Sequence, residues 1–126
     1  MKTFTFRYNP FQPSTTKLLK KALVGKPYVR PDELVSKDLK ALLQIATEPR
    51  LEIFQTIVNE KPNSVYELAE ILHKSQPYIL KEVRILEGLE LIRLDKEVVG
   101  GRERLKPVAL YSKIAFDFQF EKEIAS

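Results

Sequence analysis

The stretch from Ser64 to Arg104 reads SVYELAEILHKSQPYILKEVRILEGLELIRLDKEVVGGRER, and it decides the fold. Its capping residues predict two short helices, one beginning after Ser64 and one after Ser75, with a tight turn at His73-Lys74 between them. A basic hairpin follows the second helix. A helix presented at an angle beside a positive β-hairpin is typical of proteins that insert a helix into a DNA groove and touch the flanking phosphates.

The capping pattern and the apolar spacing of this stretch support both helices. Ser64-Val65-Tyr66-Glu67 has the form of a capping box, in which the serine hydroxyl and the glutamate each satisfy a free backbone amide. Ala69 is small enough for two helices to cross closely through a short turn. The second helix is predicted over 75–87, with Pro77 in its first turn. Its expected buried stripe is Ile79, Val83 and Leu86.

The other side of the second helix is polar, and its exposed residues are expected to be Gln76, Tyr78, Lys81, Glu82 and Arg84. Glutamine can read adenine, lysine and arginine can reach guanine or phosphate, and tyrosine can bond a phosphate or pack on a base methyl. The plain alternative is an amphipathic helix with a solvated face. Leu80 and Ile85 lie off the buried stripe, so they are expected to meet thymine methyls, a neighbouring element or a subunit. The predicted DNA contacts of this helix are Ser75, Gln76, Tyr78, Lys81 and Arg84.

The hairpin, which we call the wing, is predicted over 97–106 by the turn signal Gly100-Gly101. Its return strand carries a cation at every second position, and this spacing places all three on one face. An ordinary polar hairpin is the alternative, and Glu97 and Glu103 weaken the wing as a pure phosphate clamp. The predicted contacts to phosphate or to the minor groove are Arg102, Arg104 and Lys106.

Length and composition limit the other possibilities. The chain has 126 residues, which is room for one ordinary domain with an appended arm or strand. It has no cysteine, which excludes disulfides and thiol catalysis, and its lone histidine, His73, argues against a His-based metal site. No catalytic triad or glycine-rich phosphate loop is recognisable, so we expect neither an enzyme nor a cofactor. No apolar run could span a bilayer and no signal peptide is apparent, so we expect a cytoplasmic protein.

The net charge of +4 is unevenly distributed along the chain. Residues 1–31 hold seven basic and no acidic residues, residues 32–72 hold four basic and eight acidic, and residues 73–106 hold eight basic and six acidic. This alternation suits a protein whose ends or wing meet a polyanion. A merely solvated basic surface explains it equally well.

Strands are predicted near both ends of the chain. Residues 3–8 alternate, with Phe4, Phe6 and Tyr8 on one side, and residues 114–120 alternate in the same way. Because neither apolar face can stay in water, we expect the two strands to lie in one sheet, within one chain or exchanged across a two-fold axis. The two-fold version is favoured, because helix-turn-helix proteins usually bind DNA as dimers.

The remaining elements follow from proline, glycine and apolar spacing. A short basic helix is expected from Ser14 or Thr15 to Val24, and an extended connector between Pro27 and Pro31. Helices are expected over 38–46 and 47–59. We divide the chain into an arm, 1–35, and a domain, 36–126, that includes the C-terminal strand.

The run from Glu48 to Tyr111 resembles a winged helix-turn-helix domain of the MarR/ArsR-like regulators. The residues that carry the resemblance are Pro49-Arg50-Leu51-Glu52-Ile53, Ser64 to Leu72, Ser75-Gln76-Pro77 with Val83 and Leu86-Glu87, and the ending Lys106-Pro107-Val108-Ala109-Leu110-Tyr111-Ser112-Lys113-Ile114. This ending is similar to a small group of predicted archaeal and bacterial regulators.

Two departures from that family matter. The family commonly has glycine where Glu90 stands, and Gly88 is expected to take its place. The metal-sensing cysteines of many ArsR-like proteins are absent, so metal sensing is not implied.

The sequence therefore predicts an α+β winged helix-turn-helix fold, a three-helix core plus a β-hairpin wing, with additional N- and C-terminal strands. The predicted function is sequence-specific binding of duplex DNA by a homodimeric transcriptional regulator, without metal or membrane. The alternative is a winged-helix protein-interaction module or antitoxin-like partner.

Overall fold

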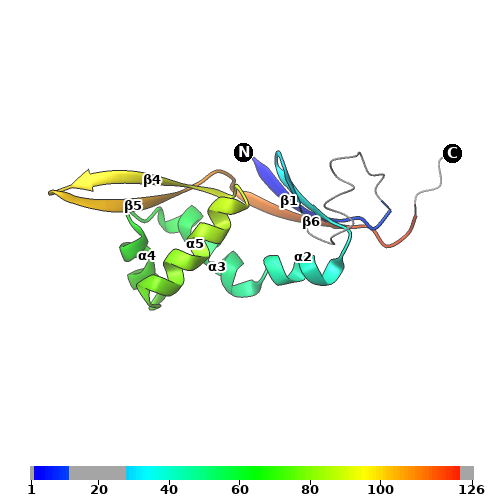
Figure 1. Cartoon of the computed structure of the whole chain (residues 1–126), viewed down its shortest axis with the longest axis horizontal. Coiled ribbons are helices and arrows are strands. Elements are labelled where there is room, and N and C mark those ends of the chain that lie inside the picture. The colour runs from blue at the N-terminus through cyan, green and yellow to red at the C-terminus, as the bar shows by residue number, and fades with distance from the viewer. Residues whose placement is uncertain (1, 12–27, 123–126) are drawn as a thin grey trace. The chain divides into compact units, whose positions relative to one another are not determined.

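The computed structural model describes residues 2–11 and 28–122, which form an α+β fold. The chain divides into two compact units, whose elements are labelled in Figure 1. We call Glu48–Ser112 the helical unit, and the described parts of Lys2–Thr47 and Lys113–Ser126 the sheet unit. This grouping differs from the expected division at residue 35, because the C-terminal strand pairs with the N-terminal one. Within the described residues, no helix is long and apolar enough to cross a membrane.

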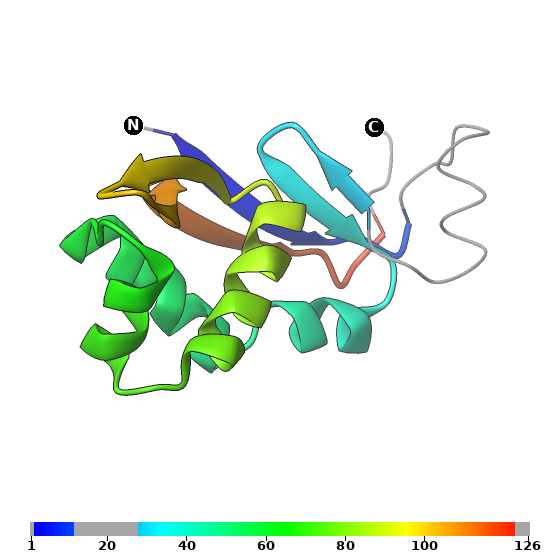
Figure 2. The ribbon, with the colours of Figure 1, turned by 60° about the vertical axis from the view of Figure 1, so that its left-hand side comes forward.

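The helical unit begins with three helices, α3 (Glu48–Glu60), α4 (Val65–Leu72) and α5 (Gln76–Gly88). Each helix buries one apolar side, and the three pack against one another (Figure 2). The predicted buried stripe of α5 is confirmed, and in α3 Ile53 is buried whereas Leu51 is only half-buried. The core of this unit consists of Ile53, Phe54, Ile57, Val65, Leu68, Ala69, Ile79, Val83, Leu86, Leu89, Leu91 and Ile92.

A two-stranded hairpin completes the helical unit. Strand β4 (Ile92–Val99) pairs antiparallel with β5 (Arg102–Ala109), and Val99 lies opposite Arg102. Gly100 and Gly101 form the loop with φ of 61° and 79°, the left-handed values that a two-residue turn joining twisted strands requires. The predicted hairpin is therefore confirmed, although its strands are longer than 97–106. Three helices followed by this hairpin are compatible with a winged-helix-like fold.

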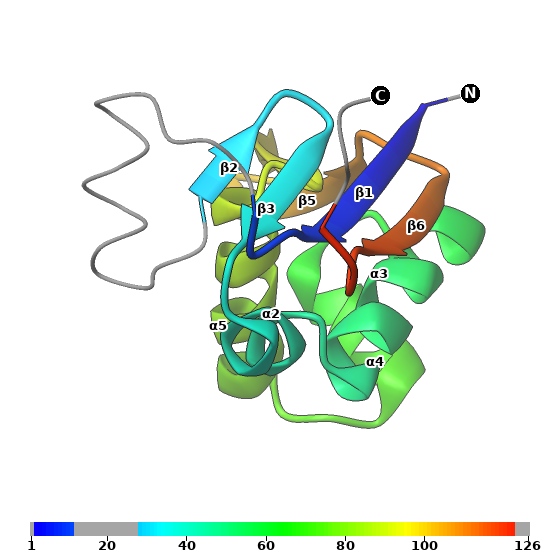
Figure 3. The same cartoon turned by 90° about the vertical axis from the view of Figure 1, so that its right-hand side faces the viewer.

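The sheet unit is a four-stranded sheet in the order β2-β3-β1-β6 (Figure 3). It contains β1 (Thr3–Tyr8), β2 (Tyr28–Arg30), β3 (Glu33–Ser36) and β6 (Lys113–Phe118). Strand β1 runs parallel to both β3 and β6, and β2 pairs antiparallel with β3. Helix α2 (Leu39–Ile45), capped by Asp38, contacts β1 and β3 and buries Leu42. The expected pairing of the two terminal strands in one sheet is confirmed, and it occurs within one chain.

One local prediction is incomplete and another is wrong. The segment between Pro27 and Pro31 is extended as expected, but it is strand β2 of the β2–β3 hairpin, in which Pro31 and Asp32 form the loop and Asp32 has φ of 65°. Gly88 does not replace the glycine of related proteins, because it lies inside α5 and Glu90 itself takes the left-handed position with φ of 61°. The basic helix expected over 14–24 lies outside the described residues.

Candidate nucleic-acid interface

The turn between α4 and α5 is built from two caps that fix the direction of α5. The Ser64 hydroxyl accepts from the Glu67 amide at 3.0 Å, and the Ser75 hydroxyl accepts from the Tyr78 amide at 3.3 Å. His73 ends α4 in the left-handed conformation, and the Lys74 amide donates to the Ala69 carbonyl at 3.0 Å. These bonds hold the first residues of α5 at the surface, where Ser75, Gln76 and Pro77 are exposed.

The exposed side of α5 has two parts that point in different directions. Successive residues of an α-helix differ by about 100°. Gln76, Leu80 and Arg84 therefore project within about 80° of one another, with Lys81 beside them. Tyr78 projects about 160° away from Leu80, so its side chain lies outside the stripe of Gln76, Leu80 and Arg84. All five of these side chains are exposed, which confirms the prediction for Gln76, Tyr78, Lys81 and Arg84.

Glu82 is not available for a ligand, and the prediction that it faces outward is wrong. Its carboxylate accepts from the Arg50 guanidinium at 3.1 Å, and the two side chains keep only 8% and 15% exposure. Arg50 lies in α3, so this pair connects α3 to α5. Removal of either charge would leave the other one buried without compensation, so the pair has a structural role.

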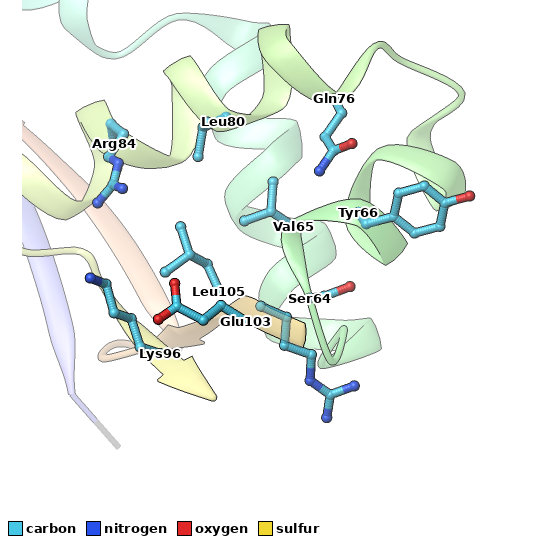
Figure 4. Close-up of a pocket in the computed structure, with 10 residues that line it drawn as sticks. Ser64, Val65, Tyr66, Gln76, Leu80, Arg84, Lys96, Glu103 and Leu105 are labelled. Carbon is cyan, nitrogen blue, oxygen red and sulfur yellow. The ribbon is translucent and has the colours of Figure 1, made fainter. Parts of the chain in front are cut away.

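A hollow of about 430 Å³ separates the stripe of α5 from the hairpin (Figure 4). Val65, Leu80 and Leu105 supply the apolar part of its wall, which explains why Leu80 lies off the buried stripe of α5. The polar part comes from three elements, α4, α5 and the hairpin. The complete lining is Ser64, Val65, Tyr66, Gln76, Leu80, Arg84, Lys96, Glu103, Arg104 and Leu105.

Three of the eight predicted DNA contacts, Gln76, Arg84 and Arg104, line this hollow together. The other five, Ser75, Tyr78, Lys81, Arg102 and Lys106, do not line it. Lys96 and Tyr66 also line it, and the sequence reasoning did not select them. Lys96 could have been found by continuing the period-2 pattern beyond Leu94, because it pairs with Leu105 on the opposite strand.

The hairpin face that carries the three predicted cations also carries acids. Arg104 lies opposite Glu97 and donates to it at 3.1 Å, and Lys106 lies opposite Asp95. Asp95 accepts from Arg93 at 2.7 Å, and this bond lowers the pKa of the Asp95 carboxyl. This face is therefore a ladder of mixed charge, in which only Arg102 near the turn has no acid directly opposite.

The net charge of the helical unit is small, and its acidic and basic residues are mixed. Residues 48–112 contain ten Lys and Arg against eleven Asp and Glu, a formal net charge of −1. Six of those cations make no ion pair with another described residue, and one of the six is Lys61. The other five lie on the α4–α5 turn, on α5 and on the hairpin, and they are Lys74, Lys81, Lys96, Arg102 and Lys106. Five of the eleven acidic residues lie on α3 and α4, and five more lie on α5 and the hairpin. The unpaired cations around the exposed side of α5 therefore lie among acids and do not form a continuous positive patch.

Comparison with known proteins places the chain in a family. Residues 45–116, more than half of the chain, match the HVO_A0114 family. The chain belongs to this family. A protein of Methanocaldococcus jannaschii, named Uncharacterized HTH-type transcriptional regulator MJ0229, is 32% identical over 68 residues, which cover 54% of this chain and 67% of that protein. No solved structure matches the chain significantly.

Proposed function

We propose that this member of the HVO_A0114 family is a winged helix-turn-helix transcriptional regulator that binds duplex DNA sequence-specifically. The observation that carries the proposal is the exposed stripe of α5, flanked by unpaired cations on the turn and the hairpin. The M. jannaschii relative, which is named an HTH-type regulator, supports the same function. In this proposal the chain is of MarR/ArsR-like type, acts as a homodimer, and needs no cofactor or metal and catalyses no reaction.

In the proposed complex, α5 enters the major groove with its exposed stripe. Gln76 and Arg84 read base edges, Leu80 packs on a thymine methyl, and Lys81 reaches a guanine or a phosphate. Ser75 and Tyr78 bind the phosphates beside the groove, because they lie at or near the helix start and off the reading stripe.

The β4–β5 hairpin is the proposed wing and holds the DNA backbone or the minor groove through Arg102, Arg104 and Lys106. Arg104 must exchange its bond to Glu97 for a phosphate, and Arg84 must exchange its bond to Glu87. Both pairs are at least one-third exposed, and pairs of that kind contribute only about 0–1 kcal/mol. The exchange therefore costs little compared with a charge-assisted bond to phosphate.

Selection of bound duplexes from random DNA, followed by affinity measurements on the selected and on a scrambled site, tests the proposal. Gln76→Ala and Arg84→Ala should each cost about 1–3 kcal/mol on the selected site and less on the scrambled site. The double reversal Arg102→Glu/Arg104→Glu should weaken binding to both duplexes alike. Gln55→Ala, an exposed change on α3, is the matched control. Failure to enrich any sequence, or equal losses on both duplexes for the α5 variants, would contradict base reading.

A protein-interaction module is the second candidate, and two observations favour it. The helical unit has a net charge of −1, and Val98 and Val99 are 71% and 50% exposed beside the hairpin turn. An apolar contact through these valines and Leu80 would bind a protein partner with little response to salt. DNA binding weakens steeply with salt, so ionic strength separates the two candidates.

A further inference from the structure

Among the described residues, strand β6 lies at the edge of the sheet, and the side that no described strand pairs with has a definite hydrogen-bonding pattern. The Gln119 amide donates to the Tyr8 carbonyl at 2.8 Å, so the odd-numbered residues of this segment turn their backbone groups toward β1. Backbone groups alternate along a strand. The amides and carbonyls of Ile114, Phe116 and Phe118 therefore point away from the sheet. An exposed edge of this kind is a template for another strand.

The side chains of β6 make this edge apolar on one face and charged on the other. Phe116 stacks on Phe6 at 5.5 Å between ring centroids but stays 49% exposed, and Phe118 lies against Phe116 at 5.9 Å. On the other face, Lys113 and Asp117 are exposed. Asp117 already accepts from Arg7, which also bonds Glu33 at 3.1 Å.

We propose that β6 pairs antiparallel with β6 of a second copy of this chain, about a two-fold axis at Ala115. Of the registers centred near the middle of the strand, only this one sets Lys113 opposite Asp117 of the second copy. Glu33, Arg7 and Asp117 form a row of charges of alternating sign, and Lys113 of the second copy extends this row by one cation on each side of the axis. Registers centred on residue 114 or 116 leave Lys113 opposite an uncharged residue, and one centred on 117 sets two aspartates against each other. Charge complementarity therefore selects the second copy and the register.

The same register satisfies the backbone and the packing. Ile114 lies opposite Phe116 of the second copy, and because both turn their backbone groups outward they form a hydrogen-bonded pair that exchanges two bonds. Ala115 then forms a non-hydrogen-bonded pair with its own copy, in which the Cα atoms approach to about 4.5 Å and a small residue fits. The aromatic face continues across the axis and covers Phe116. The result is one eight-stranded sheet, since each copy supplies four strands.

This inference deepens the homodimer named in the proposed function, and its test uses no DNA, so it can fail while DNA binding stands. The chain has no cysteine, which makes Ala115→Cys a unique thiol at the axis. Two Cα atoms about 4.5 Å apart are within disulfide range, whereas cysteines at position 113 of the two copies would lie about 13 Å apart. Under mild oxidation, full-length Ala115→Cys should become a covalent dimer and Lys113→Cys should stay monomeric on non-reducing gels.

Sedimentation of the cysteine-free chain gives an independent readout. Lys113→Glu should raise the dimer dissociation constant by about tenfold, because two cross-strand pairs change from opposite to like charge. Lys40→Glu, which makes the same charge change on α2, should leave the constant unchanged. A parent that is monomeric at micromolar concentration, or cross-linking at 113 rather than 115, overturns the proposal. Equal effects of Lys113→Glu and Lys40→Glu overturn it as well.

Discussion

Replacement of Glu82 by alanine should destabilise the helical unit more than any other removal of a charge there. The Arg50–Glu82 pair is the most buried ion pair in the described residues, with 15% and 8% side-chain exposure and a 3.1 Å bond. Breaking a buried pair on one side costs about 3–5 kcal/mol. Because both side chains stay slightly exposed to solvent, we expect a loss of unfolding free energy at the lower end of this range, about 3 kcal/mol. The melting temperature should fall by about 10 °C or more.

Urea unfolding followed by circular dichroism measures this loss, and the chain has no tryptophan to serve as a fluorescent probe. Glu87→Ala breaks the exposed Arg84–Glu87 pair of the same helix and should cost less than about 1 kcal/mol. The double change Arg50→Met/Glu82→Leu fills the site with apolar groups and should recover most of the stability lost in Glu82→Ala. A loss below about 1 kcal/mol in Glu82→Ala, or a double variant as unstable as the single one, would show that the buried Arg50–Glu82 pair does not hold α3 against α5.

Two further outcomes are expected. A hydrogen bond to Glu70 raises the pKa of Tyr66, so the stability it contributes is present below the ordinary tyrosine pKa and is lost as pH rises through the folded value. Absorbance titration should show that Glu70→Ala lowers the pKa of the Tyr66 phenol, and an unchanged pKa in Glu70→Ala would rule out the bond. Glu90→Gly should stabilise the chain by about 1 kcal/mol in urea unfolding, because glycine takes φ of 61° without strain. A loss of stability would contradict the left-handed conformation of residue 90.

The parts of the fold that follow from local chemistry could be predicted from the sequence. Ser64 and Ser75 cap their helices, the alternation of residues 3–8 gives a strand, and Gly100-Gly101 gives the hairpin turn, because each signal lies within a few residues of the structure it specifies. Strands β2 and β3 escaped prediction because three or four residues are too few for a periodic pattern.

The site was harder to predict, because its geometry depends on distant partners. Glu82 lies next to the buried stripe of α5, and only Arg50, 32 residues away, decides that it turns inward. Lys96 joins Gln76 and Arg84 only because β4 continues beyond Leu94 and pairs with β5. Helix periodicity placed Gln76, Tyr78, Lys81 and Arg84 outside correctly, but it did not show which of them share one direction.

The salt dependence of binding to a mixed-sequence duplex shows whether this surface binds DNA. Five cations of the turn, α5 and the hairpin make no ion pair with a described residue, and each phosphate they neutralise contributes about −0.9 to the slope of log K against log salt. Fluorescence anisotropy over a range of potassium chloride concentrations should therefore give a slope of about −4.5. A slope between about −1 and zero, or no binding at the lowest salt, would contradict a DNA-binding function for this surface.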